Sequence, residues 1–224
     1  MTEITKINQW NRWHAGLIFF IGLVTIYLEN NILLILGAIG SFTYYFFSHL
    51  SLLRTYQPFG GYANWVTSFR LSLLFILLAW GTQIEFSTIF GIALIAISLD
   101  GLDGYLARKY NTASSFGAYF DMETDAFYVC LMSFLLYQND LLPSWILLIG
   151  LMRYGAVIAE IILGLHGQPA PPNPFARYIA GFLFVVLLMP WVFPKTIYYL
   201  PVSIGAILVT FSFAYSFYLF FKKT

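Results

Sequence analysis

The sequence predicts an all-α fold, a polytopic transmembrane helical bundle in which a two-helix hairpin precedes six further helices. Two observations predict it. Of the 224 residues, 60% are apolar and only 9% are charged, whereas a typical soluble domain is about 25% charged. In addition, apolar runs long enough to cross about 30 Å of hydrocarbon recur along the chain. The single cysteine, Cys130, excludes a disulfide scaffold, and a net charge of +1 offers no basic field for nucleic acid.

Eight apolar stretches are expected to cross the membrane. Glycine, proline and polar residues separate them, and these residues favour turns over helix interiors. For the first two stretches, a re-entrant hairpin is the alternative. The expected spans are Ala15–Leu28, Ile32–Phe47, Val66–Trp80, Thr88–Leu106, Phe116–Tyr137, Ser144–Leu165, Tyr178–Val192 and Tyr199–Phe221.

Two longer connections separate these spans. His49–Trp65 is semi-polar, and we expect it to include an amphipathic helix on the membrane surface. His166–Ala176 contains four prolines, which predict an irregular loop. We divide the chain into residues 1–53, which hold the first two stretches, and residues 54–224, which hold the other six.

The basic residues predict the orientation, because short cytoplasmic loops carry an excess of lysine and arginine. With the N-terminus in the cytoplasm, only Lys195 lies on the opposite side, and Arg153 falls within a helix. His14 and His49 are interpreted as anchors at the membrane interface. The basic residues on or near the cytoplasmic side are then Lys6, Arg12, Arg54, Arg70, Arg108, Lys109, Arg177, Lys222 and Lys223.

Half of the ten acidic residues lie in one short segment, at Asp100, Asp103, Asp121, Glu123 and Asp125. An ionised group at the centre of a membrane helix costs about 2.5–3.5 kcal/mol on insertion scales, so such carboxylates are candidate functional groups. The spacings of three and four residues place each aspartate pair on one helix face. Glu123 is two residues from its neighbouring aspartates and faces away from them, which indicates a brace and not a ligand.

We expect the four aspartates to meet, because the short loop Arg108–Ser115 makes the two helices antiparallel neighbours. Carboxylates that converge repel one another unless a cation neutralises them. Oxygen-only ligands favour hard divalent ions such as Mg²⁺ or Mn²⁺. Two other interpretations use the same residues: a charged hairpin with satisfied salt bridges, and a divalent-cation transporter. The apolar stretches Ile92–Ser98 and Leu131–Leu136 argue against a continuous polar path across the membrane.

The aspartate segment reads Asp100-x2-Asp103-Gly104-x2-Ala107-Arg108-x8-Gly117-x3-Asp121-x3-Asp125. It resembles the complete signature of the CDP-alcohol phosphotransferase (CDP-alcohol phosphatidyltransferase) family, integral membrane enzymes of phospholipid synthesis. A second segment, Asn64-x2-Thr67-x2-Arg70, is similar to the family's sequence at the start of its first core helix. The resemblance covers roughly residues 55–221; it implies that the last six spans, within residues 54–224, correspond to the family's six-helix core and that the N-terminal hairpin lies outside it.

The resemblance implies roles for these residues. Asp100, Asp103, Asp121 and Asp125 are implied as ligands of two divalent ions, Mg²⁺ or Mn²⁺, and Asp125 also as the base that deprotonates the acceptor hydroxyl. The residues implied on the CDP-donor side are Asn64, Thr67, Arg70, Gly104, Ala107, Arg108 and Gly117.

The implied reaction transfers a phosphatidyl group from CDP-diacylglycerol to a small alcohol and releases CMP. An aminoalcohol transfer to a lipid acceptor is the alternative within the family, and an inactive scaffold is a further one. By resemblance we also expect membrane lipids and a second copy of the chain as partners. The compact size favours a bacterial plasma membrane, with the active site on the cytoplasmic side.

The acceptor is less well indicated. Arg153 and Glu160 are seven residues apart on one helix face, and Arg153 either binds an acceptor phosphate, with Arg177, or pairs with Glu160 or Glu123 as a brace. Family members that make phosphatidylglycerophosphate or use inositol phosphate typically carry a Gly-Lys segment before the fifth core helix. This chain has Asn-Pro-Phe-Ala-Arg at 173–177, so the sequence does not identify the acceptor.

Overall fold

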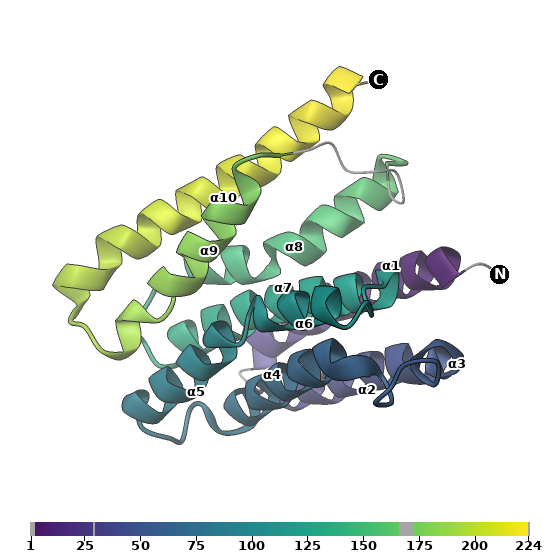
Figure 1. The fold of residues 1–224 in the computed structure, drawn as a ribbon. Coiled ribbons are helices and arrows are strands. Elements are labelled where there is room, and N and C mark those ends of the chain that lie inside the picture. Colours follow the sequence, from purple (N-terminus) through teal and green to yellow (C-terminus); the bar gives the residue numbers. More distant parts are fainter. Residues whose placement is uncertain (1–2, 29, 166–172, 224) are drawn as a thin grey trace.

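The structure is a computed structural model that describes residues 3–28, 30–165 and 173–223, and no strand occurs among them. The predicted all-α polytopic bundle is confirmed (Figure 1). The expected loop at His166–Ala176 lies largely outside the described residues. The helices are α1 (Glu3–Leu28), α2 (Ile32–Ser48), α3 (Leu50–Leu53), α4 (Gly61–Trp80), α5 (Phe86–Ser98), α6 (Leu102–Lys109), α7 (Ser115–Gln138), α8 (Trp145–Ile162), α9 (Ala176–Val186), the 3₁₀ helix η1 (Met189–Trp191) and α10 (Lys195–Lys223).

Each of the eight expected spans contains a helix, but they differ in their ability to cross a membrane. Five helical ranges are long and apolar enough to do so: α1, α4, α5 with α6, α8 and α10. Helix α2 and the range from α9 to η1 are apolar but shorter. Helix α7 has 24 residues and carries three carboxylates in its first half, which lowers its mean hydropathy.

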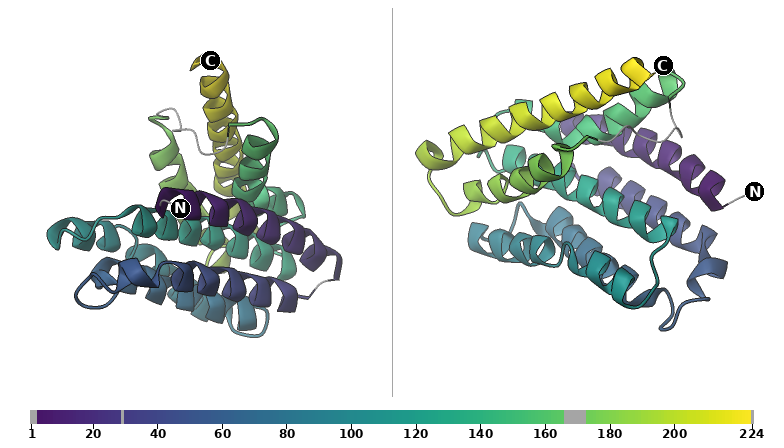
Figure 2. Two further views of the ribbon diagram at one scale, coloured as in Figure 1. Left: turned by 90° about the vertical axis from the view of Figure 1, so that its right-hand side faces the viewer. Right: turned by 45° about the horizontal axis from the view of Figure 1, so that its top comes forward.

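Helix α7 forms the centre of the bundle. Most of its residues after Phe127 are buried, because it packs against α4, α8 and α1 (Figures 1 and 2). Helices α9 and α10 pack against each other, and α10 also contacts α8. Both chain ends and α3 lie toward the right of Figure 1, whereas the first residues of α5 and α10 lie toward the left. The carboxylate-bearing half of α7 therefore belongs to the same end of the bundle as the chain termini.

The connection between α3 and α4 depends on two glycines. Gly60 and Gly61 both have φ of +77°, a conformation that costs glycine little because it has no Cβ. The Gly60 amide donates to the Leu53 carbonyl at 2.9 Å, which returns the chain tightly to the start of α4. The amphipathic helix expected in this stretch is present only as the single turn α3.

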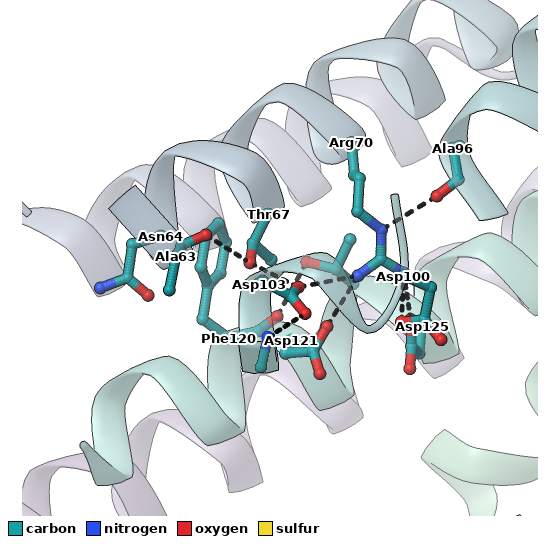
Figure 3. Close-up of polar contacts among 12 residues, drawn as sticks. Ala63, Asn64, Thr67, Arg70, Ala96, Asp100, Asp103, Phe120, Asp121 and Asp125 are labelled. Atoms are coloured by element: carbon teal, nitrogen blue, oxygen red, sulfur yellow. Dashed lines mark hydrogen bonds and ion pairs between the residues drawn. The ribbon is translucent and has the colours of Figure 1, made fainter. Parts of the chain in front are cut away.

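The fourth expected span is not one continuous helix. It is interrupted between α5 and α6, where Gly101 adopts φ of +81°. Asp100 therefore lies in a turn and Asp103 in the first turn of α6, so the prediction that they share one helix face is wrong. The left-handed glycine redirects the backbone and still leaves the two side chains close together (Figure 3).

Candidate active site

One arginine lies at the centre of the four aspartates. The side chain of Arg70, from the middle of α4, is 4% exposed and forms ion pairs with Asp100, Asp103, Asp121 and Asp125 (Figure 3). Its Nη1 donates to Asp103 at 3.1 Å and to Asp121 at 2.7 Å. Its Nη2 lies 3.1 Å from Asp100 Oδ1 and 2.5 Å from Asp125 Oδ1. Each terminal nitrogen thus joins one aspartate of the α5–α6 segment to one of α7.

Helix α4 therefore brings the two aspartate segments together. Both α6 and α7 pack against α4, so the sequence-based picture of a simple antiparallel pair omitted the helix between them. Arg70 Nε is held by the Ala96 carbonyl of α5 at 3.1 Å, which sets the plane of the guanidinium. A planar group with five donors in a fixed fork suits this multiple recognition of carboxylates.

Asp103 is the most enclosed of the four carboxylates, with its residue 5% exposed. Its Oδ2 accepts hydrogen bonds from Thr67 Oγ1 at 3.0 Å and from Arg70. Its Oδ1 accepts from the backbone amide of Gly104 at 2.7 Å. Both oxygens are therefore positioned by neighbouring groups, which keeps the carboxylate in one orientation.

The residues present fit a divalent cation. Asp100, Asp103 and Asp121 each offer a carboxylate oxygen, and these oxygens lie within 4.8 Å of one another. One guanidinium balances one of the four negative charges, so the set retains excess negative charge that a hard cation would neutralise. Asp125 does not belong to this group of three, although it shares Arg70 with them.

A cavity of about 260 Å³ opens beside the carboxylates. Asp103 and Asp121 form part of its wall, so the cavity and the carboxylate cluster share two residues. Six of the seven residues implied for the CDP donor line it, and the seventh, Arg70, lies among the aspartates instead. The cavity is lined by Ala63, Asn64, Thr67, Asp103, Gly104, Ala107, Arg108, Thr112, Ala113, Ser114, Gly117, Ala118 and Asp121.

The start of α7 is built to leave this cavity open. Ser114 caps the helix, because its Oγ accepts a hydrogen bond from the Gly117 amide at 3.1 Å. A Cβ at Gly117 would lie 3.1 Å from Asn64 Oδ1, tighter than an ordinary van der Waals contact. The Asn64 side chain is itself held, because its Nδ2 donates a hydrogen bond to the Gly60 carbonyl at 2.7 Å. A glycine at 117 therefore preserves space between α4 and α7.

Comparison with known families shows which family the chain belongs to. Residues 61–218 match the model of the CDP-alcohol phosphatidyltransferase family, which is more than half of the chain. The chain belongs to this family. The match confirms the resemblance drawn from the aspartate segment, and it begins at the first residue of α4, so α1, α2 and α3 lie outside it.

Two curated relatives are similar to this chain over part of their length. The chain is 35% identical over 97 residues to a cardiolipin synthase (CMP-forming) of Streptomyces coelicolor, covering 41% of this chain and 45% of that protein. It is 38% identical over 85 residues to a CDP-diacylglycerol–glycerol-3-phosphate 3-phosphatidyltransferase of Bacillus subtilis, covering 38% of this chain and 44% of that protein. The chain thus spans less than half the length of these relatives. No solved structure matches it.

The two arginines considered for the acceptor lie apart from the cavity wall. Arg153 Nη2 donates to Glu123 Oε1 at 2.8 Å, so the expected brace to Glu123 is present. Arg177 is exposed in the first turn of α9. An acceptor role for either side chain stays a prediction.

Sequence reasoning missed the partners of Glu123 on α1. Asn11 and His14 of α1 approach this buried carboxylate, and His14 is 0% exposed, so its interpretation as an interfacial anchor is wrong. His49 is also buried, at 3%. Both imidazoles are covered by aromatic rings, since His14 stacks on Trp10 and the ring centres of His49 and Tyr45 lie 4.8 Å apart. Asn11 and His14 are three residues apart and share a helix face, but nothing in their own segment points to Glu123.

Proposed function

We propose that this protein transfers a phosphatidyl group from CDP-diacylglycerol to the hydroxyl group of a small polar alcohol and releases CMP. The observation that carries the proposal is the sharing of Asp103 and Asp121 between the carboxylate cluster and the adjoining cavity. A nucleotide seated in the cavity would bring its pyrophosphate to the carboxylates. The membrane-spanning helices supply the surroundings that a diacylglycerol donor requires.

The proposed reaction is a substitution at the phosphorus that carries diacylglycerol. The acceptor oxygen forms a bond to this phosphorus, the bond from phosphorus to the CMP oxygen breaks, and CMP leaves with the bonding electrons. We propose that Asp125 takes the hydroxyl proton, the role that the family resemblance implies for it; it does not belong to the group of three close carboxylates. Arg108, in the cavity wall, offers a guanidinium to the negative charge of the nucleotide phosphates.

Asp100, Asp103 and Asp121 would hold the divalent cations, and we propose Mg²⁺ or Mn²⁺. Such ions, when bound, stabilise negative charge on the attacking and leaving oxygens. The chain's own part is to keep the ligands in place, which Thr67 and the Gly104 amide do for Asp103. We also propose that this end of the bundle faces the cytoplasm of a bacterial cell. Both chain ends lie at this end of the bundle, and they carry Lys6 and Lys222, which are among the basic residues predicted to be cytoplasmic.

The experiment is an acceptor panel with the purified full chain in mixed micelles. CDP-diacylglycerol is offered with Mg²⁺ or Mn²⁺ and with glycerol 3-phosphate, inositol phosphate, serine or choline, and CMP release is measured. Glycerol 3-phosphate comes first, because the Bacillus relative's name pairs it with CDP-diacylglycerol. We expect CMP release that requires the metal and one acceptor and that disappears in Asp125→Asn.

Two further arms separate the alternatives. CDP-choline with diacylglycerol tests aminoalcohol transfer to a lipid acceptor. Uptake of Mn²⁺ into proteoliposomes without nucleotide tests a transporter. Metal uptake with no CMP release from any combination would overturn the proposal.

A further inference from the structure

A buried polar network links the N-terminal hairpin to α7, on the side of that helix away from the aspartates. Its centre is Glu123, which is 0% exposed. Glu123 Oε1 accepts hydrogen bonds from Asn11 Nδ2 at 2.7 Å and from Arg153 Nη2 at 2.8 Å. Glu123 Oε2 lies 3.9 Å from His14 Nε2. One carboxylate on α7 is thus held by side chains of α1 and α8.

On the hairpin side of this network, α1 and α2 are joined by hydrogen bonds and ring contacts. His14 Nδ1 lies 2.8 Å from Ser41 Oγ of α2, and Trp10 Nε1 donates to the Ser41 carbonyl at 3.1 Å. The Trp10 ring stacks on His14 with ring centres 4.7 Å apart and on Tyr45 at 3.9 Å. Asn11 and His14 therefore project from a packed two-helix unit and not from a loosely attached helix.

The hairpin also holds the first turn of α7. Tyr45 OH of α2 donates to the Phe116 carbonyl at 2.9 Å, and the two rings stack with centres 4.5 Å apart. The next residue, Gly117, lines the cavity. Two separate points of α7, one at Phe116 and one at Glu123, are therefore fixed by α1 and α2.

Stability alone does not account for this arrangement. Glu123 and Arg153 form an ion pair in which the Glu123 side chain is 1% exposed. Taking two charged groups out of water costs free energy, and a buried ion pair is often no better for stability than well-packed apolar residues. A network retained at that cost points to a positional role.

Helix geometry shows which position it would control. At about 100° per residue, Glu123 is about 160° from Asp125 and from Asp121 around the helix axis. Holding Glu123 therefore sets the rotation of α7 and with it the direction of both aspartates. A rotation of about 20° would move a side-chain end, about 5–6 Å from the axis, by about 2 Å. A misplacement of about 1 Å at a reacting centre can lower a rate by about 100-fold.

We propose that the α1–α2 hairpin, which lies outside the family match, positions α7 through the Asn11–Glu123 hydrogen bond. Asn11 and Glu123 are then positioning residues for Asp121 and Asp125. This inference rests on the proposed function only for its kinetic readout. It assigns a task in the reaction to a segment that supplies no residue to the cavity or the cluster.

The main test variant is Asn11→Leu, which removes the amide at nearly constant size and changes no residue of the matched segment. We expect kcat for CMP release to fall about 10-fold, with KM for CDP-diacylglycerol changed less than 2-fold, because the cavity wall on α4 and α6 stays in place. Mn²⁺ affinity should fall about 5-fold, since Asp121 is displaced. Asn11→Gln, which retains an amide donor, should recover most of the kcat.

The control is Ile18→Val. Ile18 is also buried in α1, at 0% exposure, and its truncation loosens apolar packing without touching Glu123. We expect near-normal kcat and Mn²⁺ affinity in this variant at a comparable loss of thermal stability. Equal losses of kcat in Ile18→Val and Asn11→Leu would overturn the proposal, because the network would then act through stability alone.

A readout without turnover separates this inference from the proposed function. Amide hydrogen exchange in the first turns of α7, residues 117–125, should be faster in Asn11→Leu than in the unmodified protein and unchanged in Ile18→Val. If the unmodified protein releases no CMP with any acceptor, the proposed function fails while this exchange result and the Mn²⁺ affinity still decide the inference. Unchanged exchange and unchanged Mn²⁺ affinity in folded Asn11→Leu would overturn it.

Discussion

Arg70 Nη1 donates to Asp121 across the interface of α4 and α7 at 2.7 Å. The same guanidinium reaches the three other aspartates, so one cation of the protein lies where a divalent cation would be attracted. Arg70 thus stabilises the carboxylates together, and it also competes with any metal that they bind.

Replacing Arg70 by Gln should separate these two effects. Removing one partner of a buried ion pair costs about 3–5 kcal/mol, and partial exposure of Asp100 and Asp121 reduces this figure. We expect the midpoint of thermal unfolding to fall by about 5 °C in EDTA. Mn²⁺ should then raise that midpoint more in Arg70→Gln than in the unmodified protein. Arg54→Gln, at an exposed arginine, is the control; an equal Mn²⁺ effect in all three proteins would contradict the prediction.

Asp125→Asn should stop the reaction while metal binding largely remains. The amide cannot accept the hydroxyl proton, so we expect CMP release to fall at least about 1,000-fold, the upper part of the range for losing a general base. Asp125 lies outside the group of three close carboxylates, so Mn²⁺ affinity, measured by electron paramagnetic resonance, should change less than about 3-fold. Asp103→Asn should lose both properties. If Asp125→Asn loses Mn²⁺ binding as completely as Asp103→Asn, Asp125 is primarily a metal ligand and the prediction is wrong.

Gly117→Ala should narrow the cavity. The added methyl group would lie 3.1 Å from Asn64 Oδ1, and Asn64 is held by its bond to Gly60. We expect KM for CDP-diacylglycerol to rise about 10-fold, corresponding to about 1.4 kcal/mol, with a smaller change in kcat. Gly91→Ala is the matched control, since a Cβ there meets no atom within 4 Å. An unchanged KM in Gly117→Ala would show that no substrate uses this space.

The comparison of sequence and structure shows which signals are local. Apolar runs and carboxylates in membrane helices are properties of single segments, so the helical ranges and the aspartate cluster were predictable. The position of Arg70 depends on how α4 packs between two other segments, which spacing along one helix does not contain. The break at Gly101 has a local signal, since glycine between two aspartates favours a turn, but the apolar run before it suggested a continuous span. The pairing of Asn11 with Glu123 joins positions 112 residues apart and has no signal in either segment alone.

The two arginines considered for the acceptor should respond differently to substitution. Arg153 pairs with Glu123 in the buried network, so Arg153→Leu should lower thermal stability and affect all acceptors alike. Arg177 is exposed at the start of α9, where a guanidinium is free to meet a phosphate. If it does so, Arg177→Gln should raise KM for glycerol 3-phosphate about 10-fold, because a lost charged hydrogen bond is worth about 1.5–3 kcal/mol. KM for an uncharged acceptor such as glycerol should then stay the same. If Arg177→Gln raises KM equally for both acceptors, Arg177 has a structural role and does not bind the acceptor phosphate. If KM for glycerol 3-phosphate rises only in Arg153→Leu, Arg153 on α8 is the residue that binds the acceptor.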